Sequence, residues 1–332
     1  MSIEGQPSSE RQGIEGLRVD ILSGGISHER DVSLRSGRRV ADVLFRAGAR
    51  VRVLEPDKGL LPALEVDRPD VVWPLLHGAG GENGALYSVL KASGYGYVGS
   101  PAGAASLAWS KASAKTLVAR AGLRTPPAVV LTSSVFRELG ADAVIGSVMR
   151  DVALPVVVKP VEGGSAQGVT HVASRGELPH ALITAFAYGD VVLIEQKIVG
   201  QEIPVTVVEL GDGEEPIAVP VEIVPTSETY DYEARYTAGE TTYFAPARVS
   251  EEVDERLRAV ARRIVEVLGL TDITRIDLIV DEAGEVWFTD AAAVPGLTET
   301  SVVPLAITTA GYGLADVYSR LVLRAAARSR PE

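Results

Sequence analysis

The sequence contains no cysteine, and this absence limits the chemistry that the protein can use. Without cysteine there are no disulfide bonds, no thiolate-bound metal ions and no cysteine nucleophile. No apolar run reaches the roughly 20 residues that span a bilayer. The N-terminal residues lack the basic start and apolar run of a signal peptide. We therefore expect a cytoplasmic protein that does not enter a membrane, with a disordered tail over residues 1–16.

An excess of positive charge is also absent, because the 332 residues carry a formal net charge of −12. A protein this acidic is a poor partner for the phosphate backbone of nucleic acid, although local basic groups can still hold a nucleotide. The P-loop sequence G-x-x-x-x-G-K-[ST] is missing as well. We therefore predict no nucleic-acid partner. Without a P-loop, any nucleotide site has to be formed by other residues.

The first hundred residues alternate between strand and helix patterns. Short apolar runs begin at Leu17, Arg50 and Asp70, and residues 32–48 show helical periodicity. This alternation predicts an α/β protein with a parallel sheet and helices on both faces. The chain is long enough for two or three packed subdomains. Ligands of such sheets lie at the carboxyl ends of the strands, which here are near Glu29 and His77.

Two glycine-rich stretches follow predicted strands. Residues 77–84, HGAGGENG, form either a loop that exposes backbone N–H groups to a ligand or a tight structural loop. Residues 163–168 follow a strand that carries Lys159. A lysine beside such a turn can hold phosphates, because N–H groups cradle them and the ammonium balances their charge. A flexible hairpin is the alternative.

Residues 275–301 contain two predicted strands joined by a turn at 281–284, with one aspartate on each strand. In this arrangement Asp277 and Asp290 can face each other, with Arg275 alongside. Two carboxylates suit a Mg²⁺ ion that carries phosphates, because Mg²⁺ takes one or two protein carboxylates and fills its other positions with phosphate oxygens and water. The alternative is a pair of solvated acids.

A long polar and aromatic segment, residues 226–246, has little apolar periodicity. Loops of this length are functional lids or disordered. Three tyrosines and Arg235 within seven residues favour a lid that orders over a ligand. Residues 250–269 instead predict an amphipathic structural helix. Glu195 and Glu202 come at the end of the apolar strand from Val191 and just after it; they either bond a ribose or an amino group or are solvated.

Eight motifs together carry a resemblance to a known family. They are GGISHERDVSLRSG, HGAGGENG, VGSPAGAASLAWSK, LPVVVKPVEGGSAQG, VLIEQKIVGQE, YDYEARYTAGETTYFAPA, RIDLIVD and PGLTETSVVP. In this order, they make the chain resemble the D-alanine:D-alanine ligases of the ATP-grasp superfamily from Leu17 to Arg328. The resemblance implies an ATP-grasp fold, with an N-terminal parallel-sheet domain over residues 17–109 and α+β subdomains over 110–200 and 201–328.

The resemblance also implies where ATP binds, which is between the second and third of these parts. Lys111 and Lys159 match lysines that neutralise ATP phosphates. The adenine- and ribose-binding segment is matched by Glu195, Gln196, Ile198 and Glu202. Arg235 stands where the family has a lid lysine that reaches the γ-phosphate, which keeps the charge and changes the donor geometry.

The amino acids bind at the junction with the first domain in this family. The residues that orient the first amino acid are matched by Glu29, Ser165 and Tyr236, with His77 beside them. Arg275 and the N–H of Gly296 match the oxyanion site, and Ser301 matches the group that holds the second substrate's carboxylate. The resemblance associates Tyr236 with dipeptide products, since relatives that make an ester carry His there.

The chain departs from the family at the metal site. The family's strand reads Glu-x-Asn, whereas Asp290 and Ala292 stand here. Alanine offers no ligand atom and aspartate is one methylene shorter than glutamate, so Asp277 and Asp290 imply one Mg²⁺ or Mn²⁺ ion or a weak two-ion site. Asn83, Gly163 and Ala166 are further departures, in place of Asp, Glu and Ser.

Our first hypothesis is an ATP-dependent ligase that joins two D-alanines in peptidoglycan precursor synthesis, as a cytoplasmic homodimer. The second is a pseudoenzyme that binds ATP and has lost turnover together with its metal ligands, which Ala292 favours. The intact set of Glu29, Tyr236, Arg275 and Ser301 argues against the second. A third hypothesis keeps the chemistry and joins other amino acids.

Overall fold

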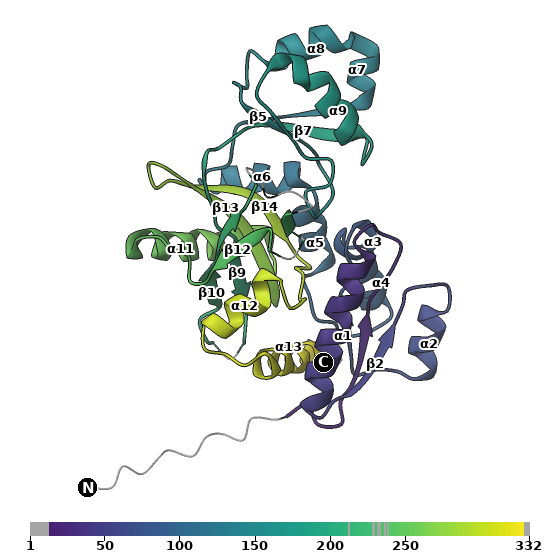
Figure 1. Ribbon diagram of the computed structural model, residues 1–332. Coiled ribbons are helices and arrows are strands. Elements are labelled where there is room, and N and C mark those ends of the chain that lie inside the picture. Colours follow the sequence, from purple (N-terminus) through teal and green to yellow (C-terminus); the bar gives the residue numbers. More distant parts are fainter. Residues whose placement is uncertain are drawn as a thin grey trace, which may run out of the picture.

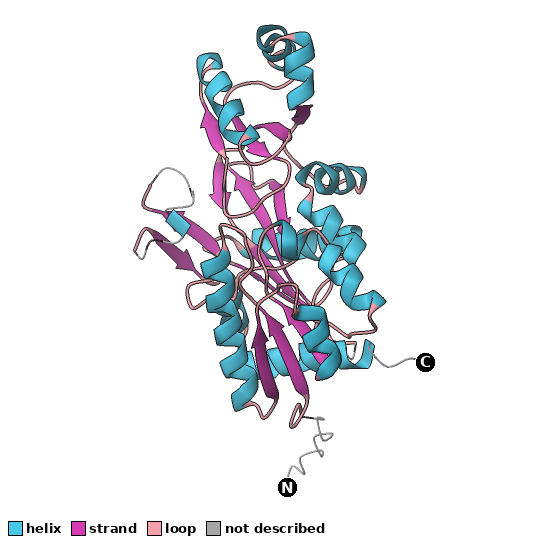
Figure 2. Ribbon diagram, turned by 90° about the vertical axis from the view of Figure 1, so that its right-hand side faces the viewer, coloured by secondary structure: helices cyan, strands magenta, loops and turns pink. Residues whose placement is uncertain are grey.

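The computed structural model describes residues 13–211, 213–227, 230, 234–235, 237 and 239–328. Figure 1 shows an elongated molecule, with the N-terminal sheet at the lower right, a small sheet with its helices at the top and a large sheet between them. In the turned view of Figure 2 the strands of the three sheets follow one another along the long axis. Within the described ranges, no helix has the length and apolarity needed to cross a membrane.

The N-terminal sheet is parallel, as the alternating pattern predicts. It has the order β2-β1-β3, and its strands are β1 (Arg18–Leu22), β2 (Arg50–Leu54) and β3 (Val71–Pro74). The helices of this part and the segment after it are α1 (Arg30–Arg46), α2 (Leu60–Val66), α3 (Ala79–Glu82), α4 (Ala85–Ala92), α5 (Ala102–Trp109) and α6 (Lys111–Arg120). Glu29, just before α1, and His77, three residues after β3, both line the pocket described below.

The small sheet is antiparallel and has the order β4-β7-β5-β6. Its strands are β4 (Ala128–Thr132), β5 (Val156–Pro160), β6 (Thr170–Val172) and β7 (Val191–Gln196). Its helices are α7 (Ser133–Leu139), α8 (Ala141–Val148), the 3-10 helix η1 (Arg175–Glu177) and α9 (Leu178–Phe186). These elements bury a hydrophobic cluster of their own, which includes Val156, Ile194 and Leu182.

The large sheet has seven strands, in the order β10-β9-β13-β8-β11-β12 with β14 paired to β13. The strands are β8 (Gly200–Glu202), β9 (Val205–Val208), β10 (Ile217–Pro220), β11 (Glu222–Pro225), β12 (Thr241–Phe244), β13 (Ile273–Asp281) and β14 (Val286–Ala292). The helices are α11 (Glu251–Leu268), α12 (Val302–Thr309) and α13 (Leu314–Arg328).

Helix α11 begins and ends where the sequence predicts. The Ser250 hydroxyl accepts a hydrogen bond from the backbone N–H of Val253 at 3.4 Å, and Gly269 closes the helix with φ +68°. A serine cap satisfies a free N–H of the first turn, and glycine enters the left-handed region without a steric penalty.

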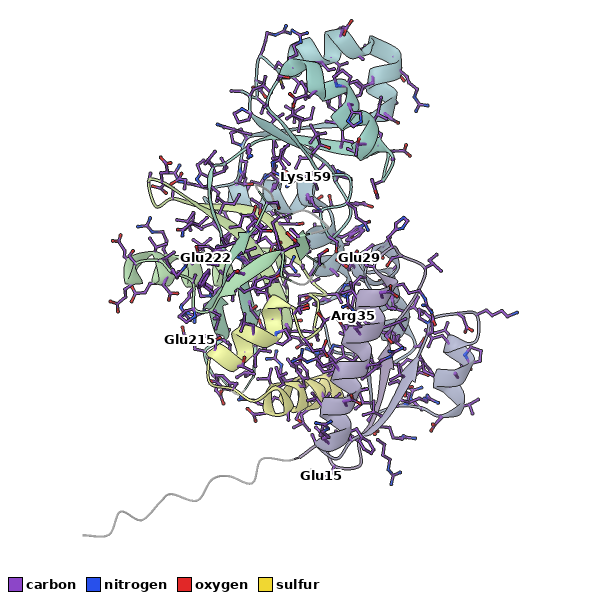
Figure 3. The ribbon with its side chains drawn as sticks, viewed as in Figure 1. Glu15, Glu29, Arg35, Lys159, Glu215 and Glu222 are labelled. Atoms are coloured by element: carbon purple, nitrogen blue, oxygen red, sulfur yellow. The ribbon has the colours of Figure 1, made fainter. Side chains whose placement is uncertain are left out.

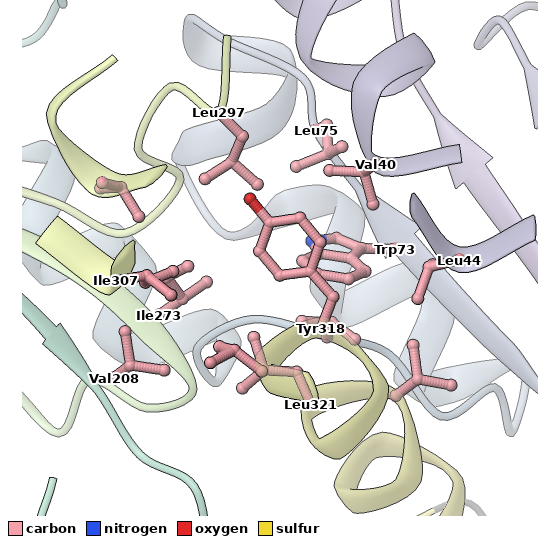
Figure 4. Packing of buried hydrophobic residues seen from close by; sticks show 14 of the residues in the cluster. Val40, Leu44, Trp73, Leu75, Val208, Ile273, Leu297, Ile307, Tyr318 and Leu321 are labelled. Atoms are coloured by element: carbon pink, nitrogen blue, oxygen red, sulfur yellow. The ribbon is translucent and has the colours of Figure 1, made fainter. Parts of the chain in front are cut away.

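A shared hydrophobic core joins the N-terminal sheet to the large sheet. Figure 4 shows Trp73 of β3 and Tyr318 of α13 at its centre, with Val208 and Ile273 of the large sheet beside them. The rings of Trp73 and Tyr318 meet edge to face, with 5.3 Å between centroids, a favourable geometry for aromatic pairs. Side chains of both sheets pack into this one core, which holds the two sheets together.

Asp272 reinforces this junction with a buried carboxylate. Its side chain is fully buried, and it accepts hydrogen bonds from Gly99 N at 2.8 Å and from Arg328 Nη1 and Nη2 at 3.0 and 2.6 Å. Asp272 has φ +64°, a left-handed conformation that aspartate and asparagine adopt more readily than most residues. One side chain thus ties the start of β13, the segment between α4 and α5 and the last turn of α13 together.

We expect Asp272→Asn to lower the free energy of unfolding by about 2 to 3 kcal/mol, because hydrogen bonds to a buried charged group are lost while the backbone conformation is kept. Urea unfolding followed by circular dichroism measures the change. Glu266→Gln is the matched control, since Glu266 forms an exposed pair with Arg263 on α11 and exposed pairs contribute at most about 1 kcal/mol. Equal losses in the two variants would contradict the role given to Asp272.

Candidate active site

A pocket of about 260 Å³ lies where the three sheets meet. Its lining includes most of the predicted site residues, namely Glu29, His77, Lys111, Lys159, Ser165, Glu195, Glu202, Arg235, Arg275, Asp277, Asp290, Gly296 and Ser301. Figure 3 shows Glu29 at the N-terminal end of α1 and Lys159 on the small sheet above it. Gln196 and Ile198 are not part of this lining, and Tyr236 lies outside the described residues. The catalytic and binding roles of all these residues stay predictions.

The loop after β5 is bonded to the start of α1. The Ser165 hydroxyl donates a hydrogen bond to Oε1 of Glu29, which is buried. Ser165 and Ala166 have φ values of +48° and +55°, a conformation that costs roughly 1–2 kcal/mol per residue without glycine. A Cβ on Gly164 would lie 3.0 Å from Glu29 Oε2, so glycine allows the close approach. The loop is thus held in a strained conformation that faces the pocket.

The glycines of residues 77–84 serve a tight structural loop. A Cβ on Gly81 would lie 1.9 Å from the carbonyl oxygen of Leu76, and one on Gly84 would lie 2.1 Å from that of Ala102. The loop still presents two titratable groups, His77 and Glu82, to the pocket. The backbone of this loop is therefore structural, and the side chains of His77 and Glu82 face the pocket.

His77 and Glu82 form a buried pair, with His77 Nδ1 3.5 Å from Glu82 Oε1. Burial lowers the pKa of His77, but the hydrogen bond and charge of Glu82 outweigh it, and the pKa lies above its ordinary value. Burial raises the pKa of Glu82, against the effect of His77. Glu82 also accepts a hydrogen bond from Gly78 N at 3.0 Å, which fixes its orientation.

Two lysines share one buried glutamate on the upper side of the pocket. Lys159 Nζ lies 2.6 Å from Glu195 Oε1, and Lys115 Nζ lies 2.8 Å from Oε2. Burial raises the pKa of Glu195, but the two ammonium groups outweigh it, and the pKa falls below its ordinary value. The Glu195 carboxylate is therefore ionised and paired with two ammonium groups, and its predicted contact with the nucleotide stays a prediction.

Lys111 stands between the glycine-rich loop and the hairpin. Its ammonium donates to the carbonyl oxygen of Gly163 at 2.5 Å and lies 3.4 Å from Asp290 Oδ2. Lys111 begins α6 and is buried. It therefore brings a positive charge to the point where the small and large sheets meet.

The hairpin of β13 and β14 forms as the sequence predicts, and Asp277 pairs with Asp290 in its register. The Arg275 guanidinium donates to both oxygens of Asp277, at 2.6 and 2.9 Å. Burial lowers the pKa of Arg275, but Asp277 more than compensates and holds the pKa above its ordinary value. Asp290 Oδ1 accepts from the N–H of Ala291 at 2.9 Å. Both carboxylates thus face the pocket with cationic partners.

The loop before α12 closes the lower side of the pocket. The Ser301 hydroxyl accepts from Thr298 N at 3.0 Å, and Leu297 N donates to Ser36 Oγ of α1 at 3.1 Å. A Cβ on Gly296 would lie 3.0 Å from Ser301 Oγ. The absence of a side chain at Gly296 keeps its backbone open toward the pocket.

The described part of the lid contributes an aromatic group and a cation. The Arg235 guanidinium lies over the Tyr230 ring, 4.2 Å from its centroid, and the hydroxyls of Tyr230 and Tyr243 are 2.9 Å apart. Burial raises the pKa of Glu202, partly offset by Arg235. Whether residues 226–246 close over a ligand stays a prediction.

Three pocket or near-pocket residues, Glu82, Lys115 and Tyr230, were not predicted as site residues. Lys115 follows Lys111 by four residues on a predicted helix, and this spacing places both on one face. Glu82 lies inside the motif at residues 77–84 and Tyr230 inside the predicted lid. The helical spacing could therefore have predicted Lys115. Glu82 and Tyr230 could be identified as pocket residues only from the folded loops.

The three-sheet architecture and the pocket between the sheets define a protein of the ATP-grasp class. A crystal structure of a D-alanine–D-alanine ligase from Bacillus anthracis has this fold, with a TM-score of 0.81 at 24% sequence identity, over 94% of this chain and 98% of that one.

Sequence comparison then places the chain more closely. Residues 117–323 match the family described as D-ala D-ala ligase C-terminus. The chain is 38% identical over 315 residues to a D-alanine–D-alanine ligase of Gloeobacter violaceus, covering 93% of this chain and 99% of the relative. It is 33% identical over 323 residues to one of Geobacter sulfurreducens, covering 97% and 98%. The chain belongs to the D-alanine–D-alanine ligase family.

Proposed function

We propose that the protein is an ATP-dependent ligase that joins two D-alanines in the cytoplasm, for peptidoglycan precursor synthesis. In the first step the carboxylate of one D-alanine attacks the γ-phosphorus of ATP, and ADP leaves. In the second step the amine of another D-alanine attacks the acyl phosphate, and inorganic phosphate leaves. The observation that carries this proposal is one pocket that combines two lysines, from α6 and the small sheet, with a carboxylate pair and an arginine of the large sheet.

The first step needs positive charge around the triphosphate. Lys111 and Lys159 provide it from two elements that meet at the pocket, and residues 163–167 of the strained loop line the same pocket. Phosphoryl transfer depends mainly on such positioning and charge stabilisation. Glu29, which accepts a hydrogen bond from Ser165, would bind the amino group of the first D-alanine.

Asp277 and Asp290 fit one hard divalent cation, Mg²⁺ or Mn²⁺. They are opposite each other in the hairpin, and the ion needs only one or two carboxylates when phosphates supply further oxygens. Ala292 lines the same pocket without a ligand atom, and the described residues contain no cluster of three or more metal-binding side chains. When bound, the ion would neutralise charge on the transferred phosphoryl group.

The second step develops negative charge on the acyl oxygen. Arg275 and the N–H of Gly296 lie in the same pocket and are suited to receive it. Ser301, just before the first residue of α12, would hold the carboxylate of the second amino acid. A homodimer also belongs to this proposal, and light scattering at micromolar concentration tests it.

The test is phosphate release from ATP with and without D-alanine, titrated with Mg²⁺ and Mn²⁺, on the natural sequence and on Ala292→Asn. We expect release only with D-alanine, and a lower metal concentration at half-maximal rate for Ala292→Asn, because the amide adds a ligand. Replacing D-alanine by other amino acids tests the substrate.

The competing function is an ATP-binding pseudoenzyme, and Ala292 is the observation that favours it. A protein that binds ATP and releases no phosphate, but becomes active as the double variant Asp290→Glu with Ala292→Asn, would decide for the pseudoenzyme.

A further inference from the structure

Lys115 is a buried cation close to the pocket to which neither step of the reaction assigns a role. It lies one helical turn after Lys111 on α6, and its side chain is only 5% exposed. Lys159 and Glu195 line the pocket, whereas Lys115 does not. The Lys115 ammonium therefore contacts Glu195 from the side that faces away from the pocket.

The two lysines and the glutamate form an array with one excess positive charge. Each oxygen of Glu195 has its own lysine, Oε1 with Lys159 and Oε2 with Lys115. Lys115 Nζ and Glu195 Oε2 form an ion pair whose angles do not meet those of a hydrogen bond. Burial lowers the pKa of Lys115 to about 8, against the effect of Glu195. Lys115 is therefore still mainly protonated at neutral pH.

When a nucleotide binds, its phosphates and Glu195 compete for the Lys159 ammonium. A phosphate in the pocket attracts the Lys159 ammonium, which is already 2.6 Å from Glu195. If Lys159 were the only partner, its movement would leave a buried carboxylate without a counter-charge, which is strongly unfavourable. A second cation on the far oxygen removes this penalty.

We infer that Lys115 is a positioning residue of the nucleotide site, which keeps Glu195 compensated so that Lys159 can turn to a phosphate of ATP. Lys115 acts through Glu195 and does not touch the nucleotide. The inference rests on the proposed binding of ATP in this pocket.

The experiment measures the binding of ADP and of adenosine to the full chain by calorimetry. The variants are Lys115→Met, Lys115→Arg, Glu195→Gln and the double variant K115M/E195Q, with Lys91→Met as the matched control on the exposed surface of α4. We expect Lys115→Met to weaken ADP binding by about tenfold, within the usual range for coupled groups. Adenosine binding should stay within twofold, because adenosine has no phosphate to draw Lys159 away.

Two further comparisons separate positioning from a general structural role. Lys115→Arg keeps the charge and should restore ADP affinity to within about threefold of the natural protein. In the Glu195→Gln background the carboxylate is gone, so adding Lys115→Met should change ADP affinity less than twofold. Effects that add in the double variant would overturn the inference, because Lys115 would then act without Glu195.

Equal losses for ADP and adenosine would also overturn it. If Lys115→Met alone does not fold, a double variant that binds ADP more than twofold more weakly than Glu195→Gln would still overturn the inference, since Lys115 would then act without the carboxylate. Failure of the natural protein to bind ADP would instead contradict the proposed nucleotide site.

Discussion

Replacing Asp277 with Asn is expected to lower the rate of D-alanine-dependent phosphate release by about 10³-fold. The variant loses one of the two carboxylates that would bind the divalent ion, and the ion stabilises charge in such reactions by several kcal/mol. Asparagine is nearly isosteric, so the strand pairing opposite Asp290 stays intact. Rates measured at saturating ATP over a range of Mg²⁺ concentrations report the change. A rate that recovers fully at high Mg²⁺ would show that Asp277 affects only the affinity for the ion.

Asp281→Asn is the matched control for this experiment. Asp281 ends the same strand and accepts hydrogen bonds from Ala283 N, Glu285 N and Trp287 Nε1 in the turn, and it does not line the pocket. We expect this variant to keep its rate within about twofold. A comparable loss in both variants would mean that the hairpin is generally sensitive to loss of charge, and the role of Asp277 would have to be withdrawn.

Replacing Arg275 with Met should reduce kcat by about 10²- to 10³-fold, the usual effect of removing one donor from an oxyanion site. The guanidinium is partly buried and held by both oxygens of Asp277, so it is oriented before the substrate arrives. ADP affinity should change much less than kcat, since Lys111 and Lys159 remain. Stopped-flow or steady-state phosphate release, together with calorimetric ADP binding, gives both quantities.

Arg275→Lys and Arg263→Met complete this comparison. Lysine keeps the charge and cannot make the two-point contact with Asp277, so we expect an intermediate rate. Arg263 forms an exposed pair with Glu266 on α11, and its loss should leave the rate unchanged. A kcat for Arg275→Met within tenfold of the natural protein would exclude an oxyanion role.

The sequence predicts those parts of the site that depend on local pattern. The hairpin of β13 and β14 follows from period-two alternation and a turn, and the serine and glycine at the ends of α11 follow from capping. The exact pairing of Asp277 with Asp290 depends in addition on a register shift between Asp277 and Leu278. Lys159 on a strand before a glycine-rich loop was also readable. These features involve residues that are near each other along the chain.

Contacts between distant segments could not be predicted from such patterns. The pairing of Glu195 with Lys115 and Lys159 joins α6, β5 and β7, and only the folded sheet brings them together. The bond from Ser165 to Glu29 spans 136 positions and depends on left-handed backbone at Ser165 and Ala166, which these residue types rarely adopt. The family resemblance suggested the participants, and the contacts among them required the structure.

The separate hydrophobic cluster of the small sheet has a consequence for how the sequence can vary. Val156, Ile194 and Leu182 pack among themselves, whereas Trp73 and Tyr318 belong to a core shared by the other two sheets. Substitutions in the small cluster can compensate one another locally. A change at Trp73 must instead suit both the N-terminal sheet and α13. Among homologues, the small sheet can therefore exchange its interior residues independently, while the shared core has to change in concert.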